Sequence, residues 1–270
     1  MIKTHLIQHI FLYHQPKNLK DYIDLRCLSI RFHMALPPPP LWVSYPNPAH
    51  VTLQSLIDRL EELRGNEENS SNVPSVIFID EGEFGSTYRF HDITIQKPIT
   101  IIGAGREKTV LIGIGLVIRG NKSDGIVEIH DLKIKEGDDG LYADRGMNVI
   151  MKGCTIEECG DHGVIALEAD ITCDDLQVSE SGGTGVYAGD DASITLSGHG
   201  TSIHGNGCWC GQGYGLKAGI CSKILLVHPL TKEKISTNNH EGRNWDVYRL
   251  HGTINQVDND GVFLQILYEG

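Results

Sequence analysis

Short apolar pairs recur along the chain at a nearly constant interval, and one other residue separates the two members of each pair. In one series the interval is 22 residues. This series consists of Val110 and Ile112, Leu132 and Ile134, Cys154 and Ile156, and Leu176 and Val178. Such alternation is typical of a β-strand that buries one face. We therefore expect four successive strands that keep one register.

Two further series of apolar pairs follow nearly the same interval, so each repeat contains three short strands. The second series is Val127/Ile129, Val149/Met151, Ile171/Cys173 and Ile194/Leu196, and the third is Leu141/Ala143, Val164/Ala166, Val186/Ala188 and Leu216/Ala218. A repeat of this size cannot bury its own apolar face, whereas stacked repeats share one core. The pattern predicts an all-β solenoid, a single-stranded parallel β-helix, over residues 75–257, with seven or eight coils.

Glycines punctuate this pattern at fixed points. Gly140, Gly163, Gly185 and Gly215 each come directly before the third strand of a repeat. We expect the backbone to turn sharply there, at places where a side chain would crowd its neighbours. Between Gly185 and Gly215 the interval grows to 30 residues, which indicates an inserted loop around CWCGQG at 208–213.

The two ends of the predicted stack carry different patterns. Leu53, Leu56, Ile57, Leu60 and Leu63 share one face at helical spacing, which predicts an N-terminal capping helix within residues 50–66. Residues 258–270 are expected to form a cap strand at the other end. Residues 1–49 contain LPPPP and YPNP and are expected to be an irregular extension or linker. Translation could start at Met1 or at Met34, and the pattern does not decide between them.

The opening of the repeat region resembles a known class of proteins. The runs LQSLID, VIFIDEGEF, ITIQKPITIIGAG and TVLIG are similar to the start of right-handed parallel β-helix proteins of the pectin-lyase-like superfamily. This resemblance covers about residues 51–227 and implies a right-handed helix behind the capping helix. The superfamily includes pectate lyases, pectin methylesterases, polygalacturonases and alginate epimerases, and also repeat domains that only bind sugars or proteins. The sequence departs from the motif spacing of the polygalacturonases and of the methylesterases.

Composition and charge narrow the range of partners. The chain has 270 residues and a net charge of −12, which opposes binding to nucleic acid or to an anionic membrane surface. No apolar run reaches the length of a membrane-spanning helix. The N-terminal stretch lacks the features of a secretion signal, and the seven cysteines show no paired framework. We therefore expect a cytoplasmic protein.

The sharpest candidate for chemistry is a column of glutamates. Glu136, Glu158 and Glu180 are 22 residues apart, so they are predicted to stack and either to splay into water or to share Ca²⁺. Calcium is the only cofactor suggested by the sequence. The resemblance implies a basic residue beside such carboxylates in a lyase, and Arg145 is a candidate. His162, in CGDHGVIALEAD, is the alternative base, although the favoured interpretation of that stretch is a solvated turn.

A second candidate is a binding face. Tyr142, Tyr187, Lys217 and Tyr248 are predicted to occupy equivalent outward positions on the third strands, forming a ladder against which sugar rings could lie. Their strands are followed by an acidic corner with Asp144, Glu168 and Asp190. Strand propensity alone also explains the tyrosines.

Three functions therefore remain open at this stage. The leading one is a non-catalytic recognition module that binds a carbohydrate or a protein through its stacked faces and the inserted loop. The second is a polysaccharide-active lyase or epimerase in which Glu158, Arg145 or His162 performs catalysis around calcium. The third is a structural scaffold for assembly. The oligomeric state is not determined by the sequence pattern.

Overall fold

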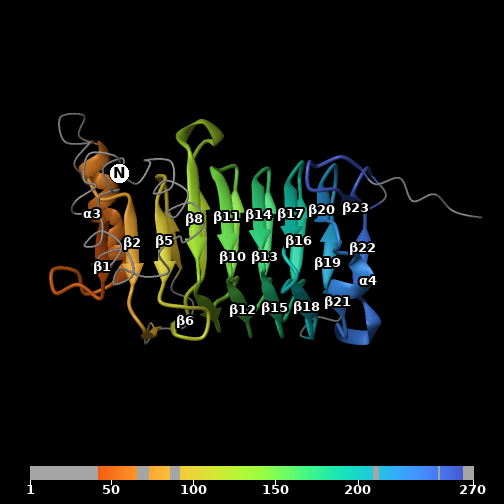
Figure 1. The fold of residues 1–270 in the computed structure, drawn as a ribbon, viewed down its shortest axis with the longest axis horizontal. Helices are drawn as coiled ribbons and strands as arrows, with labels where there is room; N and C mark the ends of the chain where they lie inside the picture. The colour runs from red at the N-terminus through yellow and green to blue at the C-terminus, as the bar shows by residue number, and fades with distance from the viewer. Residues whose placement is uncertain (1–41, 66–72, 86–91, 209–212, 249, 264–270) are drawn as a thin grey trace, which may run out of the picture.

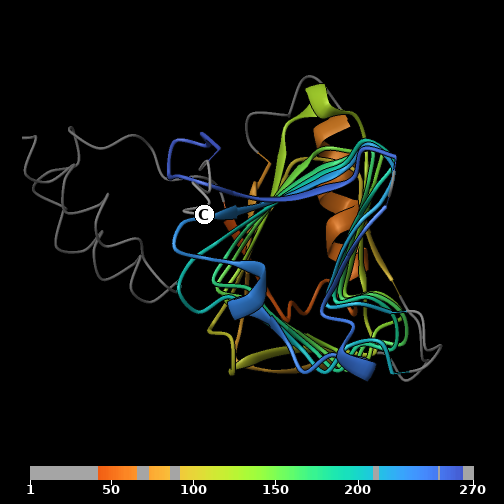
Figure 2. The ribbon, with the colours of Figure 1, turned by 90° about the vertical axis from the view of Figure 1, so that its right-hand side faces the viewer.

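The chain folds as a stack of coils along one axis (Figure 1). The computed structural model describes residues 42–65, 73–85, 92–208, 213–248 and 250–263. Each complete coil contributes one strand to each of three sheets, and the strands of a sheet pair in parallel from one coil to the next. Seen along the stack, the three sheets enclose the core in a roughly triangular cross-section (Figure 2). The parallel β-helix expected from the sequence is confirmed.

The first sheet has nine strands, and the second and third sheets have seven each. The first sheet comprises β1 (Trp42–Tyr45), β2 (Val76–Ile79), β5 (Thr100–Gly103), β8 (Ile126–His130), β11 (Asn148–Lys152), β14 (Asp170–Asp174), β17 (Ser193–Ser197), β20 (Lys223–Val227) and β23 (Thr253–Val257). The second comprises β3 (Gly82–Gly85), β6 (Thr109–Ile112), β9 (Lys133–Lys135), β12 (Thr155–Glu157), β15 (Gln177–Ser179), β18 (Ser202–His204) and β21 (Ser236–Thr237). The third comprises β4 (Ile93–Ile95), β7 (Leu116–Arg119), β10 (Leu141–Asp144), β13 (Val164–Leu167), β16 (Val186–Gly189), β19 (Leu216–Ala218) and β22 (Trp245–Val247).

The apolar series of the sequence form the core, with one error in register. From Leu132 onward, the residues of all three series are buried. The prediction was wrong for Val110 and Ile112, which align with Lys133 and Lys135 on the outside, while Leu111 faces inward opposite Ile134. Leu111 lies 23 residues before Ile134, and the connection between β7 and β8 is longer than the one between β10 and β11, so the interval of 22 residues does not extend back to β6.

Glycines at the start of the third sheet allow the coils to approach closely. A Cβ atom at Gly163 would lie 2.3 Å from Cγ1 of Val178 and 2.6 Å from the carbonyl oxygen of Gly185. At Gly140 it would lie 2.3 Å from Cγ2 of Ile156. The crowding expected from the sequence is therefore present, and it fixes the path of the chain immediately before β10 and β13.

The N-terminal end of the stack is covered by a helix. Helix α3 (Leu53–Gly65) lies at the end beside β1 and β2, and its apolar face, including Leu56 and Ile57, joins the buried core (Figure 1). Residues 42–45 form β1 and pair with β2, so the expectation of an irregular segment is wrong there. Residues 1–41 lie outside the described part of the chain. Trp42 of β1 also packs edge-on against Phe78 of β2.

The C-terminal end contains short helices as well as strands. Helix α4 (Lys232–Ile235) and the 3-10 helix η4 (His240–Gly242) lie in connections between strands there, whereas the other 3-10 helix, η3 (Lys122–Asp124), connects β7 to β8. Of the predicted cap strand over 258–270, the structure shows one antiparallel bridge between Val257 and Phe263. Residues 264–270 lie outside the described residues.

Polar residues enter the interior at the turn between the second and third sheets. Asn206 and Asn239 are both buried there, and the amide of Asn206 donates a hydrogen bond to Oδ1 of Asn239 over 3.0 Å. Oδ1 of Asn206 accepts the backbone N–H of Ser181 at 3.0 Å. These bonds satisfy buried amide groups and fix the turn from one coil to the next. Cys154 and Cys173 are buried among apolar residues, as expected.

Candidate functional site

Two successive turns bring acidic residues together at the corner between the second and third sheets. Asp138 and Asp139 lie directly before Gly140 and β10, and Asp161 and His162 occupy the same place before β13. The backbone N–H of Asp161 donates to the carbonyl of Asp138 at 2.7 Å. The backbone N–H of His162 donates to Oδ1 of Asp139 at 2.9 Å. We call this group, Asp138, Asp139, Asp161 and His162, the acidic corner.

The imidazole of His162 lies between two carboxylates of the acidic corner. Its Nδ1 atom is 2.9 Å from Oδ1 of Asp161 and 3.5 Å from Oδ1 of Asp139. Ligand atoms of these three residues all lie within 4.8 Å of one another, and they are the group of this kind found in the described part of the chain. The arrangement could hold a proton between a base and two acids, or accept a cation.

The surroundings of Asp138 shift the pKa of its carboxyl. Partial removal of its carboxyl from water raises the pKa of Asp138, and the nearby carboxylates of Asp139, Asp161 and Asp92 raise this pKa further. His162 acts in the opposite direction. A carboxyl with a raised pKa in a cluster of other carboxylates is a recurring feature of acid–base catalysis.

The sequence contains a signal for this corner, although Asp138 and Asp139 were not among the predicted site residues. Asp138 and Asp139 precede Asp161 and His162 by 23 residues, about one repeat, so the two pairs lie in equivalent turns of successive coils. The partners of His162 therefore come from the preceding coil, because the following coil offers Gly183 and Thr184 at the same place.

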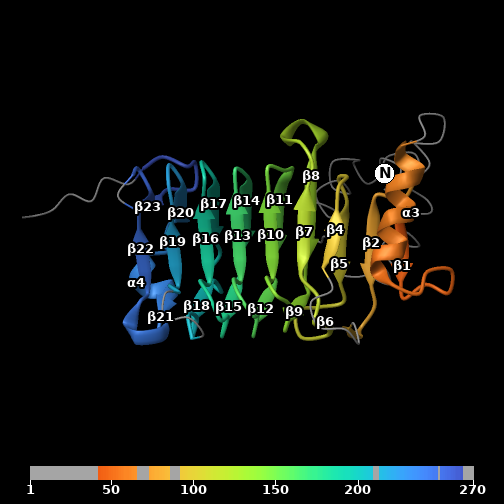
Figure 3. The same ribbon diagram turned by 180° about the vertical axis from the view of Figure 1, so that it is seen from behind.

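Beside the corner, the outward positions of the third sheet form a continuous face. Figure 3 shows the strands concerned side by side. The register aligns Val117, Tyr142, Ile165, Tyr187 and Lys217. Val117 is 9% exposed and Ile165 is 7% exposed, because neighbouring side chains of the column cover them. We call these five outward residues the tyrosine face.

The predicted ladder is correct for its central members and wrong at its last one. Tyr142 and Tyr187 lie two coils apart, at a distance of about 10 Å, on either side of Ile165. After Lys217 the column continues with Asp246. Tyr248 is two residues further along, past the end of β22, and is 49% exposed. The register of β22 therefore excludes Tyr248 from the column.

Tyr187 joins the tyrosine face to the acidic corner. Its ring centroid lies 5.7 Å from that of His162, at an interplanar angle of 30°. The Lys217 ammonium lies 5.7 Å from the same centroid and 5.5 Å from the ring of Tyr214. A Cβ atom at Gly189 would be 2.8 Å from the Tyr187 hydroxyl oxygen, so this glycine leaves room for the ring along the sheet. Burial raises the pKa of Tyr187.

A second set of predicted site residues follows the strands of the third sheet at their other end. Nε of Arg145 lies 3.2 Å from Oε1 of Glu168 and 4.0 Å from Oδ1 of Asp144. Asp190 occupies the following turn of the same corner, and its φ of 50° is left-handed like that of Glu168. Four-residue strands, about 13 Å long, separate Arg145 from the turn that holds His162. Arg145 and His162 therefore do not share one catalytic site.

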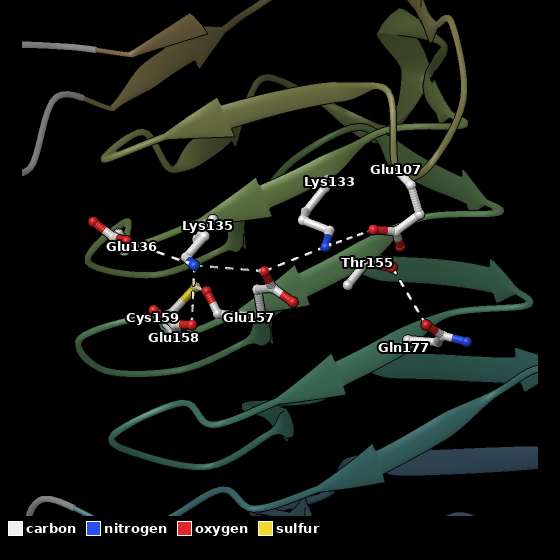
Figure 4. Close-up of polar contacts among 9 residues, drawn as sticks. All are labelled: Glu107, Lys133, Lys135, Glu136, Thr155, Glu157, Glu158, Cys159 and Gln177. Atoms are coloured by element: carbon white, nitrogen blue, oxygen red, sulfur yellow. Dashed lines mark hydrogen bonds and ion pairs between the residues drawn. The ribbon is translucent and has the colours of Figure 1, made fainter. Parts of the chain in front are cut away.

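The glutamate column forms as predicted, but a lysine lies within it (Figure 4). Glu136, Glu158 and Glu180 have similar left-handed φ angles of 59°, 56° and 56° in successive coils. The Lys135 ammonium is 3.0 Å from Oε1 of Glu158 and 3.8 Å from Oε1 of Glu136. This ammonium supplies the positive charge that calcium was expected to provide. Calcium binding at the column stays a prediction, and it would require Lys135 to move.

The same outer face of the second sheet carries a chain of ion pairs. Nζ of Lys133 lies 2.9 Å from Oε2 of Glu107 and 3.3 Å from Oε1 of Glu157. Burial lowers the pKa of Lys133, but the pairing with Glu107 and Glu157 more than offsets this, so the pKa is raised overall. Figure 4 shows Glu157 between Lys133 and Lys135. These side chains neutralise one another, which indicates a structural role.

Cysteine chemistry has little support in the described residues. Burial raises the pKa of Cys154 and of Cys159 to about 12, which keeps both as thiols at neutral pH. Cys208 and Cys221 are exposed. The inserted loop is described only up to Cys208 and from Gly213 onward, because residues 209–212 lie outside the described part.

Residues 114–242 match a family model described as "Right handed beta helix region". Together with the parallel stack of three sheets, this match confirms the class indicated by the sequence resemblance. The chain is a right-handed parallel β-helix repeat protein. No curated protein matches the sequence. The described residues contain no helix of sufficient length and apolar character to cross a membrane.

Solved structures with a similar course of the chain include the catalytic domain of a GH87 α-1,3-glucanase in complex with tetrasaccharides. The TM-score is 0.49 at 13% identity, and the alignment covers 83% of this chain and 40% of that one. The same domain in complex with nigerose gives 0.46 at 15% identity, covering 71% and 39%. ORF18 of Geobacillus virus E2 gives 0.41 at 12% identity, covering 77% and 50%. The chain thus spans about 40% of the length of the glucanase domains, and these values do not indicate a shared function.

Proposed function

We propose that this β-helix binds a carbohydrate on the tyrosine face, with the acidic corner contacting the sugar hydroxyls. The observation that carries the proposal is the position of Tyr187 between His162 and Lys217, at the border of the two groups. Aromatic rings offer an apolar surface to the C–H face of a sugar, and carboxylates accept hydrogen bonds from its hydroxyls. Both kinds of group therefore lie side by side here.

The shape of the tyrosine face suits an extended chain better than a single sugar. The sheet continues past Tyr142 and Tyr187, and the rings of these two residues are separated by two coil spacings, about 10 Å. Ile165 fills the position between them. An oligosaccharide lying along the stack would meet one aromatic side chain in every second coil. A globular protein partner would not need such spacing.

The test is a binding measurement on matched tyrosine variants. Neutral and charged oligosaccharides would be screened on a glycan array, and hits would be titrated by calorimetry. Tyr187→Ala is expected to weaken binding about tenfold, the scale of an aromatic contact of roughly 1.5 kcal/mol. Tyr248→Ala is the control, since this tyrosine is exposed but lies outside the column. Carbohydrate binding is ruled out as the function of this face if no oligosaccharide binds, or if both variants behave alike.

A second function, glycoside hydrolysis, is favoured by the raised pKa of Asp138. Hydrolysis with inversion or retention requires one carboxyl that donates a proton to the leaving oxygen and another that acts as base or nucleophile. We propose Asp138 for the first role and Asp161 or Asp139 for the second. Both would lie next to a sugar held on Tyr187, since His162 contacts Asp161 and Tyr187 alike.

Hydrolysis is tested by release of reducing ends from the oligosaccharide that binds. Asp138→Asn is expected to lower the rate at least about 100-fold, the usual contribution of a general acid, while binding is retained. Glu83→Gln, which removes an exposed carboxylate on β3, serves as the control. Absence of any released reducing end from a tightly bound oligosaccharide would leave recognition as the sole function.

A further inference from the structure

The tyrosine face is bordered by carboxylates at both ends of its strands. Before the strands lies the acidic corner, and after them lie Asp144, Glu168 and Asp190. The column itself ends on Asp246. Of the cations near these strands, Arg145 is paired with Glu168, and Arg119 at the end of β7 stands opposite Asp144 in the register. If this face binds a carbohydrate as proposed, its border discriminates sugars by their charge.

Lys217 does not neutralise this border in the described structure. Its ammonium lies over the rings of Tyr187 and Tyr214 at 5.7 Å and 5.5 Å, and it forms no ion pair with a carboxylate of the described residues. The negative charge of the acidic corner is therefore offset mainly by His162, whose charge depends on its protonation. Repulsion among these carboxylates is strong enough that Asp139 and Asp161 contribute to the raised pKa of Asp138.

The second sheet shows how the same fold balances charge when no ligand is needed. There, Glu157 lies between Lys133 and Lys135 at 3.3 Å and 3.9 Å. The acidic corner has no such lysine among the described residues. Its oxygens remain available to a cationic group or a hydroxyl donor brought by a ligand.

We infer that the tyrosine face selects an oligosaccharide that carries no carboxylates, and that it prefers one with free amino groups. An ammonium group of an amino sugar would form charge-assisted hydrogen bonds with the acidic corner. A uronate would bring a further negative charge toward carboxylates already close together. At a separation of about 4 Å in water, one such charge changes affinity by about fivefold in either direction, and salt weakens the effect.

The experiment compares three oligosaccharides of equal length, made of glucosamine, N-acetylglucosamine or galacturonate. Calorimetric titration of the full chain at low salt is expected to rank them in that order, with steps of about fivefold. High salt should reduce the difference between glucosamine and N-acetylglucosamine and leave the affinity for the neutral oligomer nearly unchanged. This ranking is measured on the unmodified protein and does not depend on any variant folding.

Variants then locate the source of the preference. The double variant Asp138→Asn/Asp161→Asn is expected to bind the glucosamine and N-acetylglucosamine oligomers equally, whereas Glu83→Gln keeps the preference. Equal or tighter binding of galacturonate, lost in Tyr187→Ala, would overturn the charge inference and leave the proposed function intact. Glucosamine binding that is unchanged in Tyr187→Ala would reveal unspecific attraction and overturn it as well. If none of the three oligomers and no array glycan binds, both proposals fail together.

Discussion

The outer faces of the second and third sheets are built from the same repeat and have opposite electrostatic character. On the second sheet, Lys133 and Lys135 lie next to glutamates of adjacent coils, and each of these two lysines has a carboxylate within 4 Å. At the edge of the third sheet, carboxylates of adjacent coils meet one another around a single histidine. Paired charges mainly stabilise a stack, whereas unpaired like charges cost stability and mark candidate sites.

The outward aromatic residues also differ between the second and third sheets. Tyr142 and Tyr187 lie in the third sheet, and their neighbours in the column are apolar or cationic. The corresponding outward column of the second sheet contains Lys133, Thr155 and Gln177. The third sheet thus has an apolar outer surface next to carboxylates that are not paired with a lysine or arginine. The second sheet does not show this combination.

The backbone beneath the acidic corner should tolerate no added side chain. Gly163→Ala is expected to lower the free energy of unfolding by about 3 kcal/mol, because its Cβ would lie 2.3 Å from Cγ1 of Val178. Gly65→Ala at the end of α3 is the matched control, since nothing lies within 4 Å of that position. Chemical denaturation of both variants provides the measurement. Equal stability of the two would show that the corner is looser than described.

The ion pairs of the second sheet should be worth more than an ordinary surface pair. Lys133→Met is expected to cost about 1 to 2 kcal/mol of unfolding free energy, because its side chain is only 15% exposed and Glu157 and Glu107 would lose their partner. Lys223→Met, at an exposed position of β20, should cost less than about 0.5 kcal/mol. A similar small effect at both positions would remove the contrast between the two sheets.

The acidic corner should cost stability at neutral pH. The pKa of Asp138 is raised above its ordinary 3.8 in the folded state, so ionisation disfavours the fold as pH rises through the folded pKa. Asp138→Asn is therefore expected to raise the thermal midpoint at pH 7 and to leave it unchanged below about pH 3. The gain should be small, because Asp138 is exposed. Thermal unfolding at both values checks this, and a lowered midpoint at pH 7 would contradict the assigned direction.

The candidate site was predictable only in part, and particular residues show why. Glu158 and Glu136 do stack, but the sequence interval says nothing about Lys135, whose long side chain reaches their oxygens. Tyr142 and Tyr187 were placed correctly because the interval between them is regular. Tyr248 was misplaced because the connection between β20 and β21, which contains α4, lengthens the last coil. Arg145 and His162 were predicted as alternative bases beside the glutamates, and the structure places them in turns at opposite ends of the third-sheet strands.

The pattern of apolar positions was enough to predict the solenoid fold, the inward-facing residues from Leu132 onward and the helix at the N-terminal end of the stack. It was sufficient because a period of about 22 residues with alternating apolar positions can bury its core only by stacking. The tertiary structure alone decided which polar groups meet. Side chains at one corner come from different coils and point in directions that depend on turn geometry, and their charges interact over a few ångströms. For that reason, the contact between His162 and Asp139 and the ion pair between Lys135 and Glu158 depend on the register of the coils.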